Sequence, residues 1–368
     1  MSGIFGVVSD KDCVDDLYLG TFYLQHRAQD YCGLALQNGG MEIHTHKGLV
    51  RQQFPKDYLK SLKGFAGIGC VSGDRQPVSE LSKEGGMIFC FDGNIINHEE
   101  VKKQLLDGGA SFSGYHNPGD VNDIGIISKI ISRRPSFSEG VRELVKLMRG
   151  DFAIIALSKK GVYAARGWGR KPLIIGKKNG SYAVSSESNS FPNTGFEIVR
   201  DVEPGEIIFL SSEGVMTIEK LDLGPVKYGT FEWIYTAHPG SVIDGRSVAE
   251  VRMNIGKALA EKYPVEADIV SPIPNSGRWH ATGYSIFSKI LYTECFVRYD
   301  YSDRSYTPSQ QVERDEEART KLIPIKSVIS GKRIVIVDDS IVRGTQLINR
   351  IRVLRELGAK EVHAMIAC

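Results

Sequence analysis

Two acidic residues and a hydroxyl-rich turn lie close together in the last tenth of the chain. The segment reads Ile334-Val-Ile-Val-Asp-Asp-Ser-Ile-Val-Arg-Gly-Thr345, and its four apolar residues precede Asp338 and Asp339. Such an apolar run predicts a buried strand, and ligands of open α/β sheets bind beyond the carboxyl ends of the strands. Carboxylates do not bind phosphate, so we expect this acid pair to bind sugar hydroxyls or a hard cation that prefers oxygen ligands.

The turn after the acid pair is suited to hold an anion. It offers consecutive backbone N–H groups, two hydroxyls and a guanidinium, from Ser340, Ile341, Val342, Arg343, Gly344 and Thr345, and it leads into a predicted helix. Phosphate is favoured at a helix N-terminus and in such a nest of N–H groups. An Asp-Asp pair alone favours a simple helix cap. The pair, the hydroxyls and the helix together favour a site for a phosphorylated sugar.

The elements that position this turn belong to the second part of the chain. Helices are expected at residues 247–262 and 346–357, alternating with strands at 267–270, 333–337 and 361–366. This βαβ alternation predicts an α/β domain with a parallel sheet and helices on its faces. The polar stretch 298–321 has no apolar period, and a loop of that length in a compact domain is usually functional or disordered.

The first part of the chain has a different order of expected strands and helices. Short strands are expected at residues 4–8, 33–37, 87–91, 152–157, 161–165, 173–176 and 207–210, and helices at 99–106, 122–132 and 138–149. Asn97 and Glu100 are expected to form a capping box at the first of these helices. Such a mixture predicts an α+β layered domain. With 368 residues the chain is long for a single core, so we expect two domains, 1–225 and 226–368.

Composition excludes several classes of function. Hydrophobic residues make up 42% of the chain and charged residues 24%, which is typical of a globular protein. A net charge of +2 without basic runs does not indicate a nucleic-acid partner. No apolar run is long enough to cross a membrane. The six cysteines form no CxxC pair and no signal segment precedes them, so we expect reduced thiols and a cytoplasmic location.

The segment 334–345 resembles the phosphoribosyl pyrophosphate (PRPP) motif of type I phosphoribosyltransferases, in particular that of the glutamine PRPP amidotransferase family. Further matches follow in order at 25–30, 185–188, 200–206, 231–235, 241–245, 272–277 and 306–322. The resemblance implies an N-terminal-nucleophile (αββα) glutamine amidotransferase domain followed by a type I phosphoribosyltransferase domain. It also implies a pentosyltransferase of purine biosynthesis, which forms 5-phosphoribosylamine and pyrophosphate from PRPP and ammonia.

The resemblance assigns roles to residues of the second domain. It implies that Ser276, Asp338 and Asp339 position Mg²⁺ and ribose, and that residues from about 304 to 321 fold over bound PRPP. Within that loop, Arg304, Arg314 and Lys321 would stabilise the negative charge of the leaving pyrophosphate. Asn275 replaces an acid that is common in the family, which leaves the metal contact of Ser276 open.

The first domain departs from the family pattern in one pocket. The family's nucleophile is a cysteine exposed by removal of Met1, whereas this chain has Ser2, and a hydroxyl is a weaker nucleophile than a thiol. The arginine that clamps glutamine is replaced by Ser72. The Asn-Gly pair of the oxyanion hole is replaced by Asp92-Gly93, and a carboxylate there repels a developing oxyanion.

Two other family positions in this pocket are retained. Arg27 matches a residue near the nucleophile, and Asp120 matches a residue that holds the substrate amine. We hypothesise that the glutaminase half is weak or lost, with Asp92, paired with Arg75, filling the glutamine site. Two alternatives stay open: Arg75 takes over the clamp and some activity remains, or Ser2 is a single replacement of the family's cysteine.

Two interpretations of the whole chain remain. The first is an enzyme that transfers ammonia to PRPP, with glutamine as a second possible donor. The second is a catalytically decayed, PRPP-binding regulatory or scaffolding homologue. The position of the first cysteine ligand of the iron–sulfur cluster found in some members is Gly229, so we do not expect a cluster. The chain ends at Cys368, where relatives continue, so we expect a shortened C-terminus, and by analogy a homo-oligomer.

Overall fold

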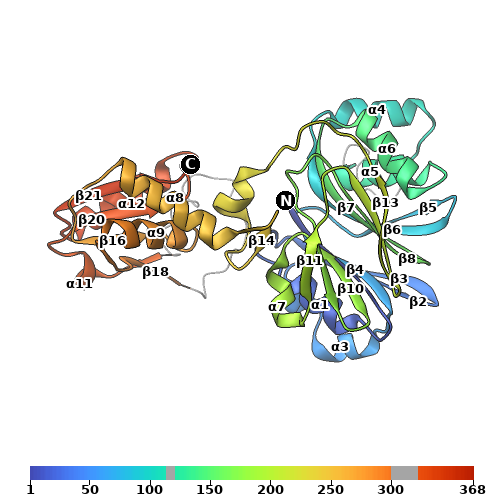
Figure 1. The fold of residues 1–368 in the computed structure, drawn as a ribbon, viewed down its shortest axis with the longest axis horizontal. Helices are drawn as coiled ribbons and strands as arrows, with labels where there is room; N and C mark the ends of the chain where they lie inside the picture. The colour runs from blue at the N-terminus through green and yellow to red at the C-terminus, as the bar shows by residue number, and fades with distance from the viewer. Residues whose placement is uncertain (113–120, 300–321) are drawn as a thin grey trace. The chain divides into compact units, whose positions relative to one another are not determined.

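The chain folds into two compact units (Figure 1). The computed structural model describes residues 1–112, 121–299 and 322–368. The first unit comprises residues 1–230 and 240–245, and the second comprises residues 231–239 and 246–368. The single boundary expected after residue 225 lies close to the first of these crossing points.

The first unit is built on two antiparallel sheets. The first sheet has the order β11-β9-β10-β1-β4-β2-β3, with β1 (Ser2–Ser9), β2 (Tyr31–Asn38), β3 (Gly40–Lys47), β4 (Ala66–Ser72), β9 (Ile174–Lys178), β10 (Ser181–Ser185) and β11 (Glu197–Asp201). The second has the order β13-β12-β8-β7-β6-β5, with β5 (Val78–Ser82), β6 (Gly85–Ile95), β7 (Gly150–Ser158), β8 (Gly161–Arg166), β12 (Glu206–Ser211) and β13 (Gly214–Lys220). A core that contains Ile4 and Cys70 from the first sheet and Cys90 and Ile155 from the second fills the space between them.

Helices cover the outer face of each sheet. The outer core of the first sheet includes residues of α1 (Val14–Phe22), α2 (Val50–Gln53), α3 (Lys56–Ser61) and α7 (Phe191–Thr194), which follows the short 3-10 helix η1 (Ser188–Ser190). The outer core of the second sheet includes residues of α4 (His98–Asp107), α5 (Asp123–Ser132) and α6 (Phe137–Leu147). The layers are therefore helix, sheet, sheet and helix, which confirms the expected αββα architecture.

The second unit contains a parallel sheet of order β17-β16-β20-β21. Its strands are β16 (Ile269–Pro272), β17 (Leu291–Tyr292), β20 (Arg333–Asp338) and β21 (Glu361–Ile366). One face packs against α12 (Thr345–Glu356), and the other packs against α8 (Val248–Lys262) and α9 (Arg278–Ser288). Shorter elements are the π-helix η2 (Glu232–Thr236), β15 (Arg246–Ser247), β18 (Phe296–Arg298), β19 (Leu322–Pro324) and α11 (Lys326–Ile329); β14 (Val242–Ile243) lies in the first unit.

The helices expected to start at residues 122 and 247 are confirmed as α5 and α8. Side chains of Asn122 and Ser247 cap α5 and α8 by accepting hydrogen bonds from backbone N–H groups three residues on. The expected capping box at α4 is wrong, because the Asn97 amide donates to the Leu147 carbonyl (2.9 Å) and accepts from the Arg149 N–H (2.7 Å). A tertiary contact thus replaces a local one. The strands β3 and β4 and the helices α1 and α9 were not predicted.

No helix within residues 1–112, 121–299 and 322–368 is both long enough and apolar enough to span a bilayer.

Candidate functional site

Ser2, the residue expected at the nucleophile position, begins the central strand β1 of the first sheet. It is 7% exposed and pairs with Ser72 of β4 across the antiparallel ladder. The Ser72 hydroxyl donates to the backbone carbonyl of Asp74, so it is used locally. The Ser2 hydroxyl accepts a long hydrogen bond of 3.4 Å from the Gln76 amide.

The carboxylate of Asp92 lies directly beside Ser2. Asp92 belongs to β6 of the second sheet, is fully buried, and accepts a hydrogen bond of 2.9 Å from the Ser2 backbone N–H. Its two oxygens also contact two cations: Arg27 Nη2 at 3.0 Å and Lys171 Nζ at 3.3 Å. A charge buried in this way is tolerated only because it is paired and hydrogen-bonded.

Arg27 links this carboxylate to a second buried acid. Its guanidinium donates to the Ser2 carbonyl through Nε (2.8 Å) and to Glu187 through Nη1 (2.7 Å). Glu187 also contacts His26 Nε2 at 2.8 Å and accepts from the Ser241 hydroxyl at 2.7 Å. Burial would raise the pKa of Glu187, but His26 and Arg27 outweigh it and lower the pKa to about 2. The pKa of Asp92 is lowered for a similar reason, since Lys171, Arg27 and the Ser2 N–H outweigh its burial.

The predicted pairing of Asp92 with Arg75 is wrong. Arg75 is exposed, whereas Asp92 is buried and contacts Arg27 and Lys171. Gly93 lies on β6 beside β7, where a Cβ would come within 2.2 Å of the Asp151 carbonyl, so a larger residue does not fit. Asp120 lies outside the described residues.

The acid pair of the second unit lies at the carboxyl end of β20, as the sequence predicts. Asp338 is half-buried and Asp339 is 4% exposed. Side chains alternate along a strand, and the residues before the pair divide accordingly: Ile334 and Ile336 face α12, and Val335 and Val337 face α8 and α9. Asp338 therefore continues the α12 face, and Asp339 follows on the α9 face.

The turn after the acid pair is open to solvent. Ile341, Val342 and Arg343 are exposed, and Val342 is 89% exposed. Gly344 has φ 74°, a left-handed conformation that favours glycine, and it precedes the first residue of α12, Thr345. The Ser340 hydroxyl donates to Asp339. Backbone N–H groups, hydroxyls and Arg343 thus surround a helix N-terminus that can hold phosphate.

Ser276 belongs to the loop that connects β16 to α9. The Ile273 N–H donates to the Val337 carbonyl at 2.9 Å, and the Gly277 N–H donates to the Ile273 carbonyl at 3.0 Å. A Cβ at Gly277 would come within 2.3 Å of the Val337 carbonyl, so the loop lies tightly against the end of β20. Ser276 is half-buried on this loop. Arg304, Arg314 and Lys321, expected over the ligand, lie outside the described residues.

The acid pair has the chemistry of a hard-cation site. Burial and the neighbouring Asp339 raise the pKa of Asp338 to about 7. Among the described residues, no three acidic, histidine or cysteine side chains gather in one metal site. Mg²⁺ commonly takes one or two carboxylates and completes its shell with water and substrate phosphates, so the two carboxylates fit that ion.

Several residues of the two sites were not predicted. Lys171 follows no recognisable pattern in the sequence. Glu187 lies in a motif that matches the family, but no role was assigned to it. Arg350 lies on the helical face of Leu347 and Leu354, and a basic residue on an apolar face is a signal for a buried charge. His280 is fully buried on α9 and interacts electrostatically with Asp339.

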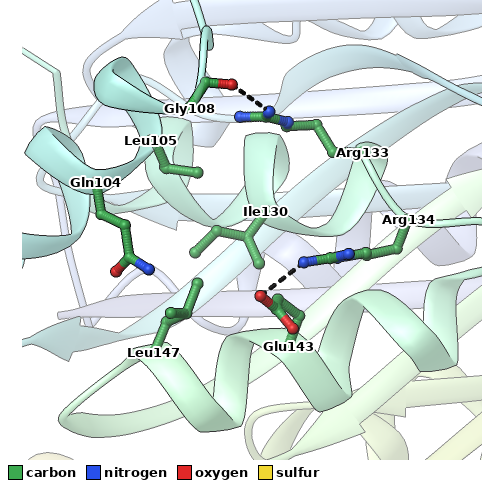
Figure 2. Close-up of a pocket in the computed structure, with 8 residues that line it drawn as sticks. All are labelled: Gln104, Leu105, Gly108, Ile130, Arg133, Arg134, Glu143 and Leu147. Atoms are coloured by element: carbon green, nitrogen blue, oxygen red, sulfur yellow. Dashed lines mark hydrogen bonds and ion pairs between the residues drawn. The ribbon is translucent and has the colours of Figure 1, made fainter.

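A separate hollow lies between the ends of α4, α5 and α6 (Figure 2). It has a volume of about 270 Å³, and none of the predicted site residues lines it. Arg133 donates to the Gly108 carbonyl at 2.6 Å, and Arg134 forms an ion pair with Glu143 at 2.6 Å. Both guanidinium groups thus hold the helices together.

Comparisons with known proteins agree with this arrangement. The family described as "Glutamine amidotransferase domain" matches residues 66–193. Over 402 residues the chain is 36% identical to the amidophosphoribosyltransferase of Methanocaldococcus jannaschii. This alignment covers 100% of this chain and 84% of that protein. It is 35% identical to the amidophosphoribosyltransferase of Methanothermobacter thermautotrophicus over 385 residues, covering 100% of this chain and 80% of that one. The chain belongs to the amidophosphoribosyltransferase family.

A solved structure extends this similarity to the fold. The structure described as glutamine PRPP amidotransferase from Bacillus subtilis, complexed with ADP and GMP, matches with a TM-score of 0.90 and 31% identity. The match covers 99% of this chain and 81% of that one. The chain is therefore a homologue of amidophosphoribosyltransferases of purine biosynthesis. It has an N-terminal-nucleophile type glutamine amidotransferase domain and a domain with a parallel sheet, as the sequence resemblance implied.

Proposed function

We propose that this amidophosphoribosyltransferase homologue uses ammonia and not glutamine to convert PRPP. Ammonia displaces pyrophosphate from the anomeric carbon, so a C–N bond forms as the C–O bond to pyrophosphate breaks. The products are 5-phosphoribosylamine and pyrophosphate, and the ammonium proton is lost to solvent. The observation that carries the proposal is the contrast between two sites: in the second unit an acid pair is followed by a solvent-exposed anion turn, whereas in the first unit the buried carboxylate of Asp92 lies beside Ser2.

The residues of the second unit support the binding of PRPP. Asp338 and Asp339 offer carboxylates to ribose hydroxyls and Mg²⁺, and the turn from Ser340 to Thr345 offers N–H groups and hydroxyls to the 5-phosphate. Ser276 is held beside the same strand end. When bound, Mg²⁺ would neutralise charge on the pyrophosphate leaving group. Arg304 and Lys321 are proposed to act on the same charge.

The residues of the first unit argue against glutamine hydrolysis. A glutaminase must donate hydrogen bonds to an oxyanion, but Asp92 can only accept them while it is ionised. Its low pKa, caused by Lys171, Arg27 and the Ser2 N–H, keeps it ionised at neutral pH. The loss of one oxyanion-hole donor alone costs about 100- to 1,000-fold in rate. Ser2 in place of a thiol lowers the rate further.

One assay distinguishes the possibilities. Pyrophosphate release from PRPP and Mg²⁺ is measured separately with ammonium chloride at pH 8 and with glutamine. We expect turnover with ammonia, none above background with glutamine, and loss of turnover in Asp338→Asn. Equal turnover with both donors would contradict the loss of the glutaminase. Binding of PRPP without turnover would instead favour the regulatory homologue. By family analogy we also propose a cytoplasmic location and a homo-oligomeric state. Sedimentation tests the oligomeric state.

A further inference from the structure

The helix that follows the anion turn (residues 340–345), α12, contains a buried arginine. Arg350 of α12 is 7% exposed, although the same face of the helix carries the core residues Leu347 and Leu354. Its guanidinium carbon lies 5.8 Å from the centroid of the Phe296 ring, in a cation–π arrangement. Burial of a guanidinium is costly unless an opposite charge is near. The location of that charge therefore matters.

Asp338 is one opposite charge that acts on Arg350. It continues the face of β20 on which Ile334 and Ile336 pack against α12, so its carboxylate and the Arg350 side chain belong to the same side of the sheet. The interaction is mutual: Arg350 opposes the rise in the pKa of Asp338, and Asp338 opposes the fall in the pKa of Arg350 that burial causes. Asp339 lies on the other side, where it interacts with His280 of α9.

We propose that Arg350 is a positioning residue of the phosphoribosyl site, whose fixed charge orients the Asp338 carboxylate and sets the balance between cation and anion binding at the acid pair. This inference rests on the proposed binding of PRPP and Mg²⁺. It goes beyond that proposal because it assigns a role to a side chain of α12 that is not part of the turn 340–345.

The charge of Arg350 has opposite effects on the two ligands. It repels a divalent cation at the acid pair, and it attracts the phosphate of a phosphorylated sugar at the start of α12. Loss of the charge should strengthen cation binding and weaken binding of the sugar phosphate. Damage to the fold would weaken both. The sign of the two changes thus separates an electrostatic role from a merely structural one.

The experiment compares four forms of the full chain: wild type, Arg350→Met, Arg350→Lys and Arg352→Met. Arg352 lies on the same helix but is exposed, so it controls for loss of an arginine from α12. Binding of Mn²⁺ alone is followed by its electron paramagnetic resonance at pH 8.5, and binding of metal-free ribose 5-phosphate by calorimetry. In Arg350→Met we expect Mn²⁺ to bind about three- to tenfold more tightly and ribose 5-phosphate about three- to tenfold more weakly.

The remaining variants complete the test. Arg350→Lys keeps the charge and should stay within about twofold of wild type for both ligands, and Arg352→Met should do the same. If Arg350→Met does not fold, Arg350→Gln replaces it and must give the same opposite-signed changes. Changes of the same sign, or none, overturn the inference while the proposed function stands. A wild-type chain that binds neither ligand overturns both.

Discussion

The backbone N–H of Ser2 donates a hydrogen bond of 2.9 Å to the buried carboxylate of Asp92. This bond links β1 of the first sheet to β6 of the second sheet, and the same carboxylate also contacts Arg27 and Lys171. The nucleophile position is thereby held next to a full negative charge. A site that must stabilise an oxyanion requires the opposite charge at this point.

Glutamine hydrolysis should therefore need two changes and not one. We expect Ser2→Cys alone to remain at background, because the Asp92 carboxylate still opposes the oxyanion. Ser2→Cys with Asp92→Asn should release measurable glutamate from glutamine, since an amide can donate a hydrogen bond. A coupled glutamate dehydrogenase assay checks this. Substantial activity in Ser2→Cys alone would mean that the serine was the only defect.

Glu187 should make the free energy of unfolding depend on pH in the acidic range. Its pKa is about 2 in the folded protein and 4.5 ordinarily, so it stabilises the fold above pH 4.5 and loses this effect as the pH falls through 2. The shift corresponds to roughly 3 kcal/mol of unfolding free energy above pH 5. In urea unfolding at pH 6, the free energy of unfolding of wild type should exceed that of Glu187→Gln by about that amount. The difference between the two proteins should shrink as the pH is lowered towards 3.

An exposed glutamate provides the control for that series. Glu197 lies on β11 at the surface, so Glu197→Gln should track wild type at each pH. A constant gap between wild type and Glu187→Gln from pH 6 to pH 3 would show that the network contributes through shape and not through charge.

Only one of the six cysteines should react in the folded protein. Cys368 is exposed, and the other five are buried. Burial raises the pKa of Cys13 and Cys32 to about 12 and of Cys295 to about 11, so their reactive thiolate forms are scarce at pH 8. Titration with a chromogenic disulfide reagent should give one fast thiol, absent in Cys368→Ser, and six after unfolding. A second fast thiol in the native protein contradicts the burial of this set.

The left-handed residue before α12 should matter for binding as well as stability. Gly344 and Gly331 both have φ 74° and open space around the position of a Cβ, but only Gly344 lies in the anion turn. Each change to alanine should lower the unfolding free energy by about 1 kcal/mol, because an L-residue disfavours this conformation. Ribose 5-phosphate should bind more weakly in Gly344→Ala alone, as calorimetry can measure. Equal loss of binding in both variants would point to global destabilisation instead.

Individual helices and strands could be predicted from the sequence where neighbouring residues determine them. The apolar run from Ile334 to Val337 specified a buried strand, and Asn122 and Ser247 marked two helix starts with side-chain oxygens that accept nearby N–H groups. The ordered family motifs also predicted both domains. Strands β3 and β4 were missed, and their places are set by pairing with β2.

The sequence alone determined which groups are present: an acid pair before an anion turn, and Asp92 and Ser2 where the family has an amide and a thiol. The tertiary structure decided which groups meet. Arg27 contacts Asp92 across 65 residues of sequence and Glu187 across 160, while the nearby Arg75 stays at the surface. The physical reason is that sheet register and layer packing fix such contacts, and neither is encoded in the spacing of a local motif.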